Sequence, residues 1–286
     1  MTYRQLYQYG VQQLAESQIA EAELEARLLL EYICRTDRNT LLVHGDSLRS
    51  DFEEQSYKMA VTQRASHIPL QHITGEQEFM GLSFRVNKNV LIPRQDTETL
   101  VEEAMCHLGD GMRILDLCTG SGCILLSLLK YSNECEGIGV DISPKALEVA
   151  RENAARLGLD AVFLEGDLFA PLAEFQSDKT TDRLFDMIIS NPPYIETAVI
   201  DTLMPEVRDY EPRIALDGTA DGLFFYREII RQAAVYMHIG AWILFEIGCN
   251  QGEAVQALLE RNGFCEVSVI KDYAGLDRVV CGLRGE

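Results

Sequence analysis

Residues 191–194, Asn-Pro-Pro-Tyr, combine a side-chain amide, two prolines and an aromatic ring. They follow the apolar run 185–190, which predicts a buried parallel strand. Consecutive prolines end such a strand, because neither can donate an N–H to the sheet. The segment thus offers two rigidly held acceptors, Asn191 Oδ1 and the Pro192 carbonyl oxygen, beside the Tyr194 ring. Two acceptors beside an aromatic ring could bind an –NH2 group attached to a planar system. The alternative interpretation of the segment is a turn that ends the strand, with a buried tyrosine.

A glycine-containing turn follows an earlier apolar run. Residues 113–118 predict a strand, and Thr119-Gly120-Ser121-Gly122 predicts a turn into a helix. Glycines let the backbone approach a ligand closely, and the helix N-terminus offers free N–H groups. The sequence pattern of dinucleotide-binding folds requires a third glycine where this chain has Leu125. The turn is therefore less suited to binding a pyrophosphate.

Two further predicted strands end in acids. Asp141 ends the run 136–141, where a carboxylate can accept both hydroxyls of a ribose or, alternatively, cap the next helix. Asp167 follows the next predicted strand, where it is either a partner for an adenine amine or an ordinary turn acid; Leu168 could cover the adenine ring. Together the three strand ends predict a nucleoside pocket without a diphosphate cradle, which is the shape of S-adenosylmethionine.

The elements that position these groups alternate between strand and helix from residue 113 onward, which predicts an α/β fold with a seven-stranded, mostly parallel sheet. The expected strands are 113–118, 136–141, 162–165, 185–190, 241–247, 264–270 and 278–283. The expected helices are 122–131, 144–157, 221–237 and 251–262.

Three domains are expected: a small all-helical domain over 1–75, a β-hairpin linker over 76–93 and the sheet domain over 94–286. The hairpin is predicted from runs at 79–86 and 90–92 around the polar turn 87–89. In the N-terminal domain Leu24, Leu28 and Tyr32 share a predicted helix face, and another helix is expected over 50–66. In the sheet domain the connection 195–220 is long, and loops of that length more often have a function than not.

Charge limits the partners that this chain can have. Its net charge is −20; residues 1–75 carry 7 basic against 10 acidic side chains, and residues 76–286 carry 18 against 35. Such a surface repels a phosphate backbone at long range, which argues against direct binding of DNA or RNA. A protein partner with a basic face fits better.

Cysteine usage and hydropathy set further bounds. The eight cysteines form no C-x-x-C pair, so buried free thiols are expected rather than a zinc site or a disulfide framework. His67 and His72 lie in a polar stretch that no other ligand completes, and no metal is expected. With no apolar stretch of 18 residues and no signal-peptide pattern, the chain is expected to be cytoplasmic, without membrane contact, and monomeric.

Beyond these patterns, the C-terminal two-thirds resembles a class I S-adenosylmethionine-dependent methyltransferase with a Rossmann-like sheet. Residues 116–122 resemble its cofactor loop, although Cys118 stands where relatives commonly have glycine. Asn-Pro-Pro-Tyr resembles the motif of enzymes that methylate adenine N6, guanine N2 or glutamine N5. The whole chain is similar to the last group, the PrmC/HemK family of peptide chain release factor glutamine methyltransferases. The segments that carry this likeness are 92–98, 190–195, 210–213 with 215–218, 221–223, 246–248 with Gln251, and 275–278. Leu168 departs from the pattern, since relatives often carry tryptophan there.

The resemblance implies methyl transfer from S-adenosylmethionine, with S-adenosylhomocysteine as the product, to N5 of the glutamine in the Gly-Gly-Gln motif of class 1 release factors. Asn191, Pro192 and Tyr194 would be catalytic, and with Pro193 they would bind the acceptor amide. The residues that would bind the cofactor are Cys118, Thr119, Gly120, Ser121, Gly122, Asp141, Asp167, Leu168 and Asn191.

Three other functions use parts of the same pattern. A nucleic-acid exocyclic amino methyltransferase would use the same Asn-Pro-Pro-Tyr motif, but the acidic C-terminal part argues against it. A non-catalytic S-adenosylmethionine-binding assembly partner would not need that motif intact. A nicotinamide oxidoreductase is disfavoured because the third glycine is absent.

Overall fold

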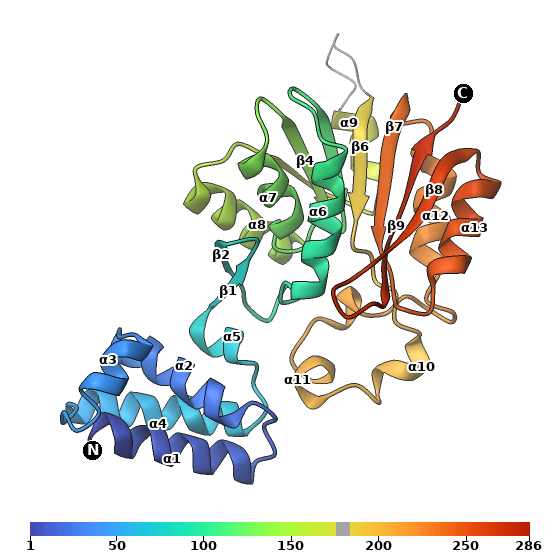
Figure 1. Ribbon diagram of the computed structural model, residues 1–286. Helices are drawn as coiled ribbons and strands as arrows, with labels where there is room; N and C mark the ends of the chain where they lie inside the picture. The colour runs from blue at the N-terminus through green and yellow to red at the C-terminus, as the bar shows by residue number, and fades with distance from the viewer. Residues whose placement is uncertain (176–183) are drawn as a thin grey trace. The chain divides into compact units, whose positions relative to one another are not determined.

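The computed structural model describes residues 1–175 and 184–286 (Figure 1). The chain forms two compact units. The first comprises Met1–Glu76 and Met204–Tyr210, and the second comprises Gln77–Leu203 and Glu211–Glu286. Among the described residues, no helix is both long and apolar enough to cross a bilayer.

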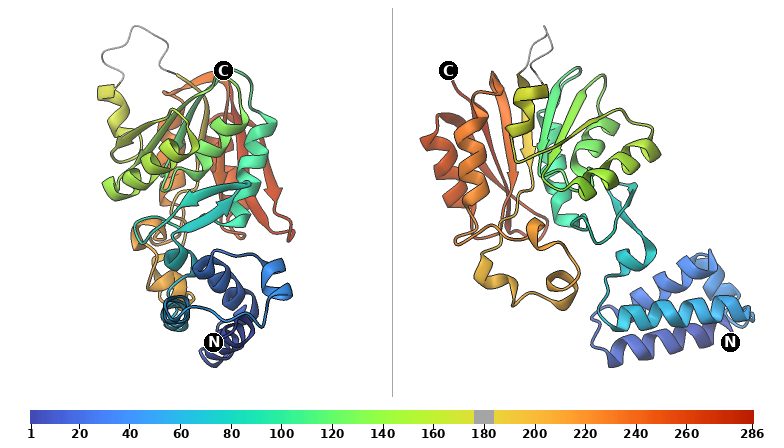
Figure 2. Two further views of the ribbon diagram at one scale, coloured as in Figure 1. Left: turned by 90° about the vertical axis from the view of Figure 1, so that its left-hand side faces the viewer. Right: turned by 180° about the vertical axis from the view of Figure 1, so that it is seen from behind.

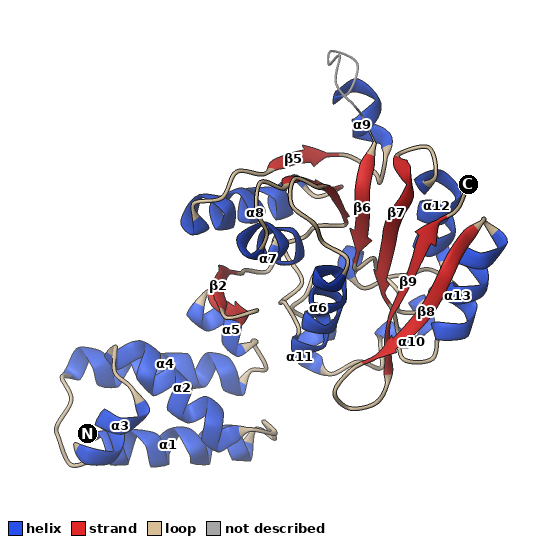
Figure 3. Ribbon diagram, turned by 45° about the horizontal axis from the view of Figure 1, so that its top comes forward, coloured by secondary structure: helices blue, strands red, loops and turns tan. Residues whose placement is uncertain are grey.

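The first unit is all helical (Figure 3). Its helices are α1 (Tyr3–Glu16), α2 (Ala22–Cys34), α3 (Arg38–Val43), α4 (Asp51–Ala65), α5 (Leu70–Thr74) and the short α11 (Pro205–Arg208). Helix α4 begins as the sequence predicts, because the Ser50 hydroxyl accepts a hydrogen bond from the Glu53 N–H and the Glu53 carboxylate accepts one from the Ser50 N–H. The predicted face of α2 is wrong, since Leu24 and Tyr32 are 41% and 48% exposed. The buried stripe is Ala22, Ala26, Leu29 and Leu30, because small alanines let α2 pack closely on its neighbours.

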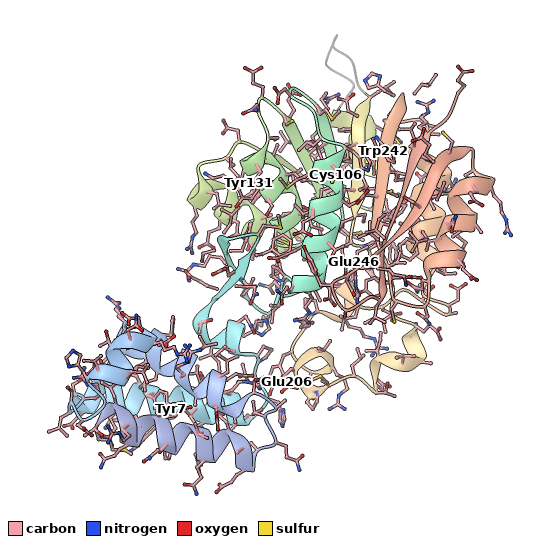
Figure 4. The ribbon with its side chains drawn as sticks, in the orientation of Figure 1. Tyr7, Cys106, Tyr131, Glu206, Trp242 and Glu246 are labelled. Carbon is pink, nitrogen blue, oxygen red and sulfur yellow. The ribbon has the colours of Figure 1, made fainter. Side chains whose placement is uncertain are left out.

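Residues of α11 are held in the first unit by a buried charge cluster. The Arg64 side chain is only 6% exposed and pairs with both Glu25 and Glu206. Glu206, labelled in Figure 4, also lies beside a histidine. His67 Nδ1 is 2.9 Å from Glu206 Oε1. A buried guanidinium requires such partners, so Glu206, far along the sequence, completes the helical unit.

The β-hairpin lies earlier than the sequence analysis expects. Strands β1 (Glu76–Phe79) and β2 (Leu82–Arg85) form a two-stranded sheet joined by Met80 and Gly81. Both connecting residues have positive φ, 51° and 69°, as in the two-residue turns that suit the twist of a hairpin. The predicted turn at 87–89 is present, since the Val90 N–H donates to the Asn87 carbonyl at 3.2 Å, but it follows the hairpin instead of joining its strands. The predicted strand at 90–92 is wrong, because these residues pair with neither β1 nor β2.

The second unit is built on a seven-stranded sheet of order β5-β4-β3-β6-β7-β9-β8 (Figures 1 and 2). The strands are β3 (Arg113–Leu117), β4 (Glu136–Asp141), β5 (Val162–Glu165), β6 (Phe185–Ser190), β7 (Met237–Glu246), β8 (Phe264–Lys271) and β9 (Asp277–Arg284). The first five are parallel, and β9 is antiparallel to β7 and β8. All seven predicted strands are confirmed. The predicted helix 221–237 is too long, since Met237 pairs with Phe185 and starts β7.

Helices cover both faces of this sheet. Helices α6 (Glu98–Cys106), α7 (Cys123–Tyr131) and α8 (Pro144–Leu157) share one buried cluster with Ile114, Met187 and Ile189. Helices α9 (Ala170–Phe175), α12 (Phe224–Ala233) and α13 (Gly252–Arg261) belong to the other face with Leu115 and Ile188. Successive strand residues thus point to opposite cores, as in a sheet buried on both sides. The remaining short helices are η1 (Gln95–Thr97), α10 (Thr197–Ile200) and η2 (Arg213–Ala215).

Candidate active site

A pocket lies at the carboxyl ends of the parallel strands. The sheet runs outward from β3 through β4 to β5 on one side and through β6 to β7 on the other. Parallel α/β sheets bind ligands at this point, where the strand order reverses. The pocket is lined by residues that follow β3, β4, β5 and β6, by the stretch before α6, and by η2 and α12.

The turn after β3 supplies one wall of the pocket. Cys118, Thr119, Gly120 and Ser121 line it, while Gly122 caps α7 with φ 78°. Gly120 has φ 55°, and a Cβ there would meet no atom within 4 Å. The glycine therefore faces open space, as a backbone that a ligand approaches closely should.

Asp141 is fixed by the backbone at both oxygens. Its Oδ2 accepts from the Gly120 N–H and its Oδ1 from the Ser143 N–H, both at 2.9 Å. Ser143, whose side chain accepts from the Ala146 N–H, is the N-cap of α8. Burial raises the pKa of the Asp141 carboxyl. The carboxylate lines the pocket and keeps lone pairs that can accept from hydroxyl groups.

Leu168 and Phe225 provide apolar surface across the pocket. Leu168 is buried with φ 48°, and Asp167 before it is exposed at the rim. Phe225, from α12, also lines the pocket and packs against the same core cluster as Leu168. Sequence reasoning missed Phe225, because in α12 it follows the pattern of an ordinary amphipathic helix.

The Asn191–Tyr194 segment leaves β6 beside this pocket. Asn191 and Pro193 line it, whereas Pro192 is buried and Tyr194 is half-buried outside the lining. The Tyr194 hydroxyl donates to Glu246 Oε1 at 3.1 Å. The structure therefore brings Asn191 to the predicted cofactor residues, and it points the Tyr194 hydroxyl toward the end of β7.

The Gln251 side chain and Gly218 hold the Tyr194 backbone. Gln251 Nε2 donates to the Tyr194 carbonyl at 3.0 Å and to the Gly222 carbonyl at 3.3 Å, while Gln251 Oε1 accepts from the Gly248 N–H at 2.9 Å. A Cβ on Gly218 would lie 2.7 Å from the Tyr194 Cα. Hence position 218 admits no side chain, and the Tyr194 backbone is fixed both by this close contact and by the Gln251 hydrogen bond.

Comparison with known proteins covers almost the whole chain. A family model described as the PrmC N-terminal domain matches residues 5–75, and a methyltransferase domain model matches residues 108–234. The release factor glutamine methyltransferase of Geobacter sulfurreducens is 43% identical over 99% of this chain and 97% of its own length. That of Moorella thermoacetica is 41% identical over the full length of both chains.

The chain belongs to the release factor glutamine methyltransferase family.

A solved methyltransferase structure from Pyrococcus furiosus matches at a TM-score of 0.52 with 16% identity, over 72% of this chain and 90% of that one. At this identity the match shows the fold alone. It agrees with the predicted class I methyltransferase sheet.

Two residues that line the pocket share one backbone feature. Cys118 has φ 59°, and Leu168 has φ 48°. Side chains other than glycine adopt this left-handed region at a cost of about 1–2 kcal/mol. The chain thus stores strain at two points of the pocket, as binding sites often do.

The pocket residues fit S-adenosylmethionine, the methyl donor of this family. The open space at Gly120 admits a ligand against the backbone, and Asp141 offers acceptors for ribose hydroxyls. Leu168 and Phe225 give apolar walls for an adenine ring. Arg94 is the basic residue among the described residues that line the pocket, and its guanidinium is already paired with Glu211. An amino-acid tail therefore suits this lining better than a row of phosphates.

Sequence reasoning also missed an ion pair that Arg94, a residue lining the pocket, makes with Glu211. Arg94 Nη2 lies 2.5 Å from Glu211 Oε2, and Glu211 Oε1 accepts from the Ile92 N–H at 3.3 Å. Glu211 is buried, so its pKa is raised by desolvation and lowered less by Arg94. Glu211 thereby ties the connection 195–220 to the stretch that precedes α6.

One cluster of possible metal ligands among the described residues lies outside the pocket. Glu103, His107 and Cys281 place their ligand atoms within 4.8 Å of one another. His107 Nε2 lies 3.0 Å from Glu103 Oε1, and its ring stacks on Trp242 at 3.7 Å. These contacts account for the cluster as packing between α6 and the sheet, and no sequence spacing could have revealed it.

Proposed function

We propose that this chain transfers the methyl group of S-adenosylmethionine to N5 of the glutamine in the Gly-Gly-Gln motif of class 1 peptide chain release factors. Family membership supports the substrate class, and the position of Asn191 in the wall of the cofactor pocket supports the chemistry. The products would be N5-methylglutamine and S-adenosylhomocysteine. Because release factors act on ribosomes, we place the reaction in translation termination and in the cytoplasm.

The role of Asn191 and Pro192 follows from the weak nucleophilicity of an amide. The nitrogen lone pair is delocalised into the carbonyl group, so the nitrogen must be held in line with the methyl group before it can attack. Asn191 Oδ1 and the Pro192 carbonyl oxygen would each accept one N–H of the glutamine amide. Alignment of this kind contributes a large part of such a rate enhancement.

The methyl donor needs no activation by the protein. S-adenosylmethionine supplies a methyl group on a positively charged sulfur, which leaves as a neutral thioether. The new N–C bond would form as the S–C bond breaks, and the amide nitrogen would then lose one proton to solvent. Asn191 and Pro192 orient the nitrogen and Pro193 stiffens the backbone between them and Tyr194, which would pack against the amide plane.

The residues that the sequence predicts to bind the cofactor are each given a role in this proposal. Thr119, Gly120, Ser121 and Gly122 form the turn against which the amino-acid tail would lie, and Asp141 would accept from the ribose hydroxyls. The residues proposed around adenine are Asp167, Leu168 and Phe225, and Cys118 and Asn191 flank the transferred methyl group. We also propose that the protein acts as a monomer.

The test is mass spectrometry of a class 1 release factor co-expressed with this chain. One added methyl group on the tip glutamine is expected, and none when the Asn191→Ala variant replaces the wild type. Labelling assays with tRNA and DNA as acceptors separate this function from base methylation. Methyl transfer to a nucleic acid but not to the release factor would refute the proposal.

A further inference from the structure

Asn153, on α8, is a buried amide whose oxygen and nitrogen are both hydrogen-bonded to backbone. It is 1% exposed. Its Oδ1 accepts from the Arg85 N–H at 2.7 Å, and its Nδ2 donates to the Arg85 carbonyl at 3.1 Å and to the Ser121 carbonyl at 2.9 Å. A reversed amide would face the N–H with a donor and both carbonyl oxygens with an acceptor. The side chain therefore has one favourable orientation, in which it joins two separate backbone segments.

The first of these segments is the turn after β3. Ser121 lies between Gly120 and Gly122, whose φ angles are 55° and 78°. Glycines adopt many backbone conformations, so a turn that contains two of them changes shape easily unless something holds it. The Ser121 carbonyl and the Gly122 N–H share one peptide plane. Because Asn153 holds that carbonyl, it also fixes the direction of the Gly122 N–H, which donates to the Thr119 carbonyl at 2.8 Å.

The second segment leads from β2, which lies beside α8, to the pocket (Figure 1). Arg85 ends β2, and the stretch 86–97 that follows supplies one wall of the pocket. The buried side chains that pack together at its start are Val86, Val90, Ala146 and Val149. Ala146, Val149 and Asn153 are three and four positions apart, so they share one face of α8. That face holds the start of the wall.

The far end of the same stretch is held by other contacts. Arg94 pairs with Glu211, and Thr97 accepts a hydrogen bond from Asn191 Nδ2 at 3.4 Å. A change at Asn153 should therefore affect the start of the wall and the turn after β3, while the Asn191 side chain keeps its own partner.

We propose that Asn153 sets the affinity for S-adenosylmethionine by holding the turn after β3 and the 86–97 wall at a fixed separation. Asn153 is not among the described residues that line the pocket, so it is a positioning residue. A turn that is already held in its bound shape need not be ordered by the ligand, and this saving appears as affinity. The inference rests on the proposed function, which lays the amino-acid tail of the cofactor against this turn.

The experiment compares Asn153→Ala and Asn153→Asp with the wild type. Alanine loses all three hydrogen bonds, whereas aspartate keeps an acceptor for the Arg85 N–H and turns a carboxylate oxygen toward the Ser121 carbonyl. Calorimetry with S-adenosylmethionine should show a Kd raised about 5- to 30-fold in Asn153→Ala, which corresponds to ordering one freed backbone residue on binding. Asn153→Asp should lose at least as much affinity.

Kinetics on the release factor give a second readout. KM for S-adenosylmethionine should rise with Kd in the Asn153 variants, whereas kcat at saturating cofactor should stay close to the wild-type value. Val255→Ala, on α13, is the matched control, because it removes buried packing outside the pocket lining. It should lower the melting temperature and leave both Kd and KM unchanged.

If neither Asn153 variant folds, Val86→Ala carries the test. Val86 is 4% exposed and packs on the same face of α8, so a smaller side chain loosens the start of the wall without leaving a polar group unpaired. Its Kd for S-adenosylmethionine should also rise, and an unchanged Kd there would contradict the inference.

A purely structural role for Asn153 would lower the melting temperature of the unliganded protein and leave Kd at the wild-type value, as in Val255→Ala. That result, or a fall in kcat with unchanged KM, would overturn the inference. Gly120→Ala separates it from the proposed function. If Gly120→Ala weakens cofactor binding and Asn153→Ala does not, only the positioning role is lost, whereas unchanged affinity in Gly120→Ala removes the proposed cofactor site itself.

Discussion

Gly222 packs against the carbonyl oxygen of Tyr194 so closely that a Cβ at 222 would overlap that oxygen. The same Cβ would lie 2.6 Å from Gln251 Nε2, which donates hydrogen bonds to the carbonyl oxygens of Tyr194 and Gly222. Gly222 also has φ 68°. The segment after β6 is thus held by a backbone contact that no other residue can make.

Gly222→Ala should therefore displace Tyr194 and disconnect it from Gln251. We expect a loss of about 1–3 kcal/mol in unfolding free energy from strain and overpacking, measured by urea denaturation, together with a marked fall in kcat. Gly111→Ala is the control, because Gly111 has φ 73° but a Cβ there would meet nothing within 4 Å. Equal effects of the two substitutions would show that backbone strain alone, not the Tyr194 contact, is responsible.

Asn191→Ala removes the amide that would accept from the substrate nitrogen. Misplacing a reacting atom by about 1 Å costs roughly 10²-fold in rate, so we expect kcat to fall by about that factor or more. Cofactor affinity, measured by calorimetry, should change much less, because Asn191 forms only one side of the pocket. Near-normal turnover would be incompatible with the acceptor role.

Gly120→Ala should weaken cofactor binding without a packing defect. A methyl group at 120 would enter open space that belongs to the pocket. Gly111→Ala again serves as the control, since it carries similar backbone strain away from the pocket. We expect both variants to lose about 1 kcal/mol of stability, and only Gly120→Ala to lose S-adenosylmethionine affinity in calorimetry. Unchanged affinity in Gly120→Ala would place the ligand elsewhere.

Cys118→Gly should relieve strain at the turn after β3. Cys118 has φ 59°, which glycine adopts freely, so we expect a gain of up to about 1 kcal/mol after the loss of the small side chain. Cys265→Gly, at an exposed β8 position outside the left-handed region, should instead lose about 0.5–1 kcal/mol. Thermal unfolding distinguishes them, and destabilisation by both would contradict the strain argument.

Asp116 should make stability depend on pH. Burial, with a smaller contribution from Asp141, raises its pKa from 3.8 to about 7. Because the folded value lies above the unfolded one, its stabilising contribution is complete below about pH 4 and is lost as pH rises through about 7. We expect Asp116→Asn to remove this decline, which is at most on the order of 4 kcal/mol, since asparagine can still accept from the Thr119 hydroxyl. Urea denaturation between about pH 5 and pH 8 tests this, and parallel slopes in both proteins would refute it.

Local patterns account for the parts of the fold that the sequence predicts well. Helix α8 is predicted to the residue because Ser143 and Pro144 mark its start and Gly158, with φ 66°, ends it. The bounds of the strand at 136–141 are also predicted to the residue, since a buried parallel strand is a continuous apolar run bounded by polar residues. These features need no knowledge of distant contacts.

The parts that escaped prediction depend on residues far apart in the sequence. Asn191 and Thr97 are 94 positions apart, and Tyr194 and Glu246 are 52 apart. No local pattern marks Thr97 as a partner of the site, because a threonine before a helix is most simply a cap. The acids at strand ends could be proposed as ligand contacts, but the residues that orient them appear only when the sheet brings its carboxyl ends together.

The helical unit is discontinuous, and this has a consequence for biosynthesis. Its buried Arg64 finds one of its two carboxylate partners in Glu206. During translation the first 76 residues must wait until strands β3 to β6 have been made before Glu206 leaves the ribosome. The N-terminal unit therefore begins folding first but is completed late, and a fragment ending near residue 75 would keep Glu25 but lack the second carboxylate that pairs with Arg64.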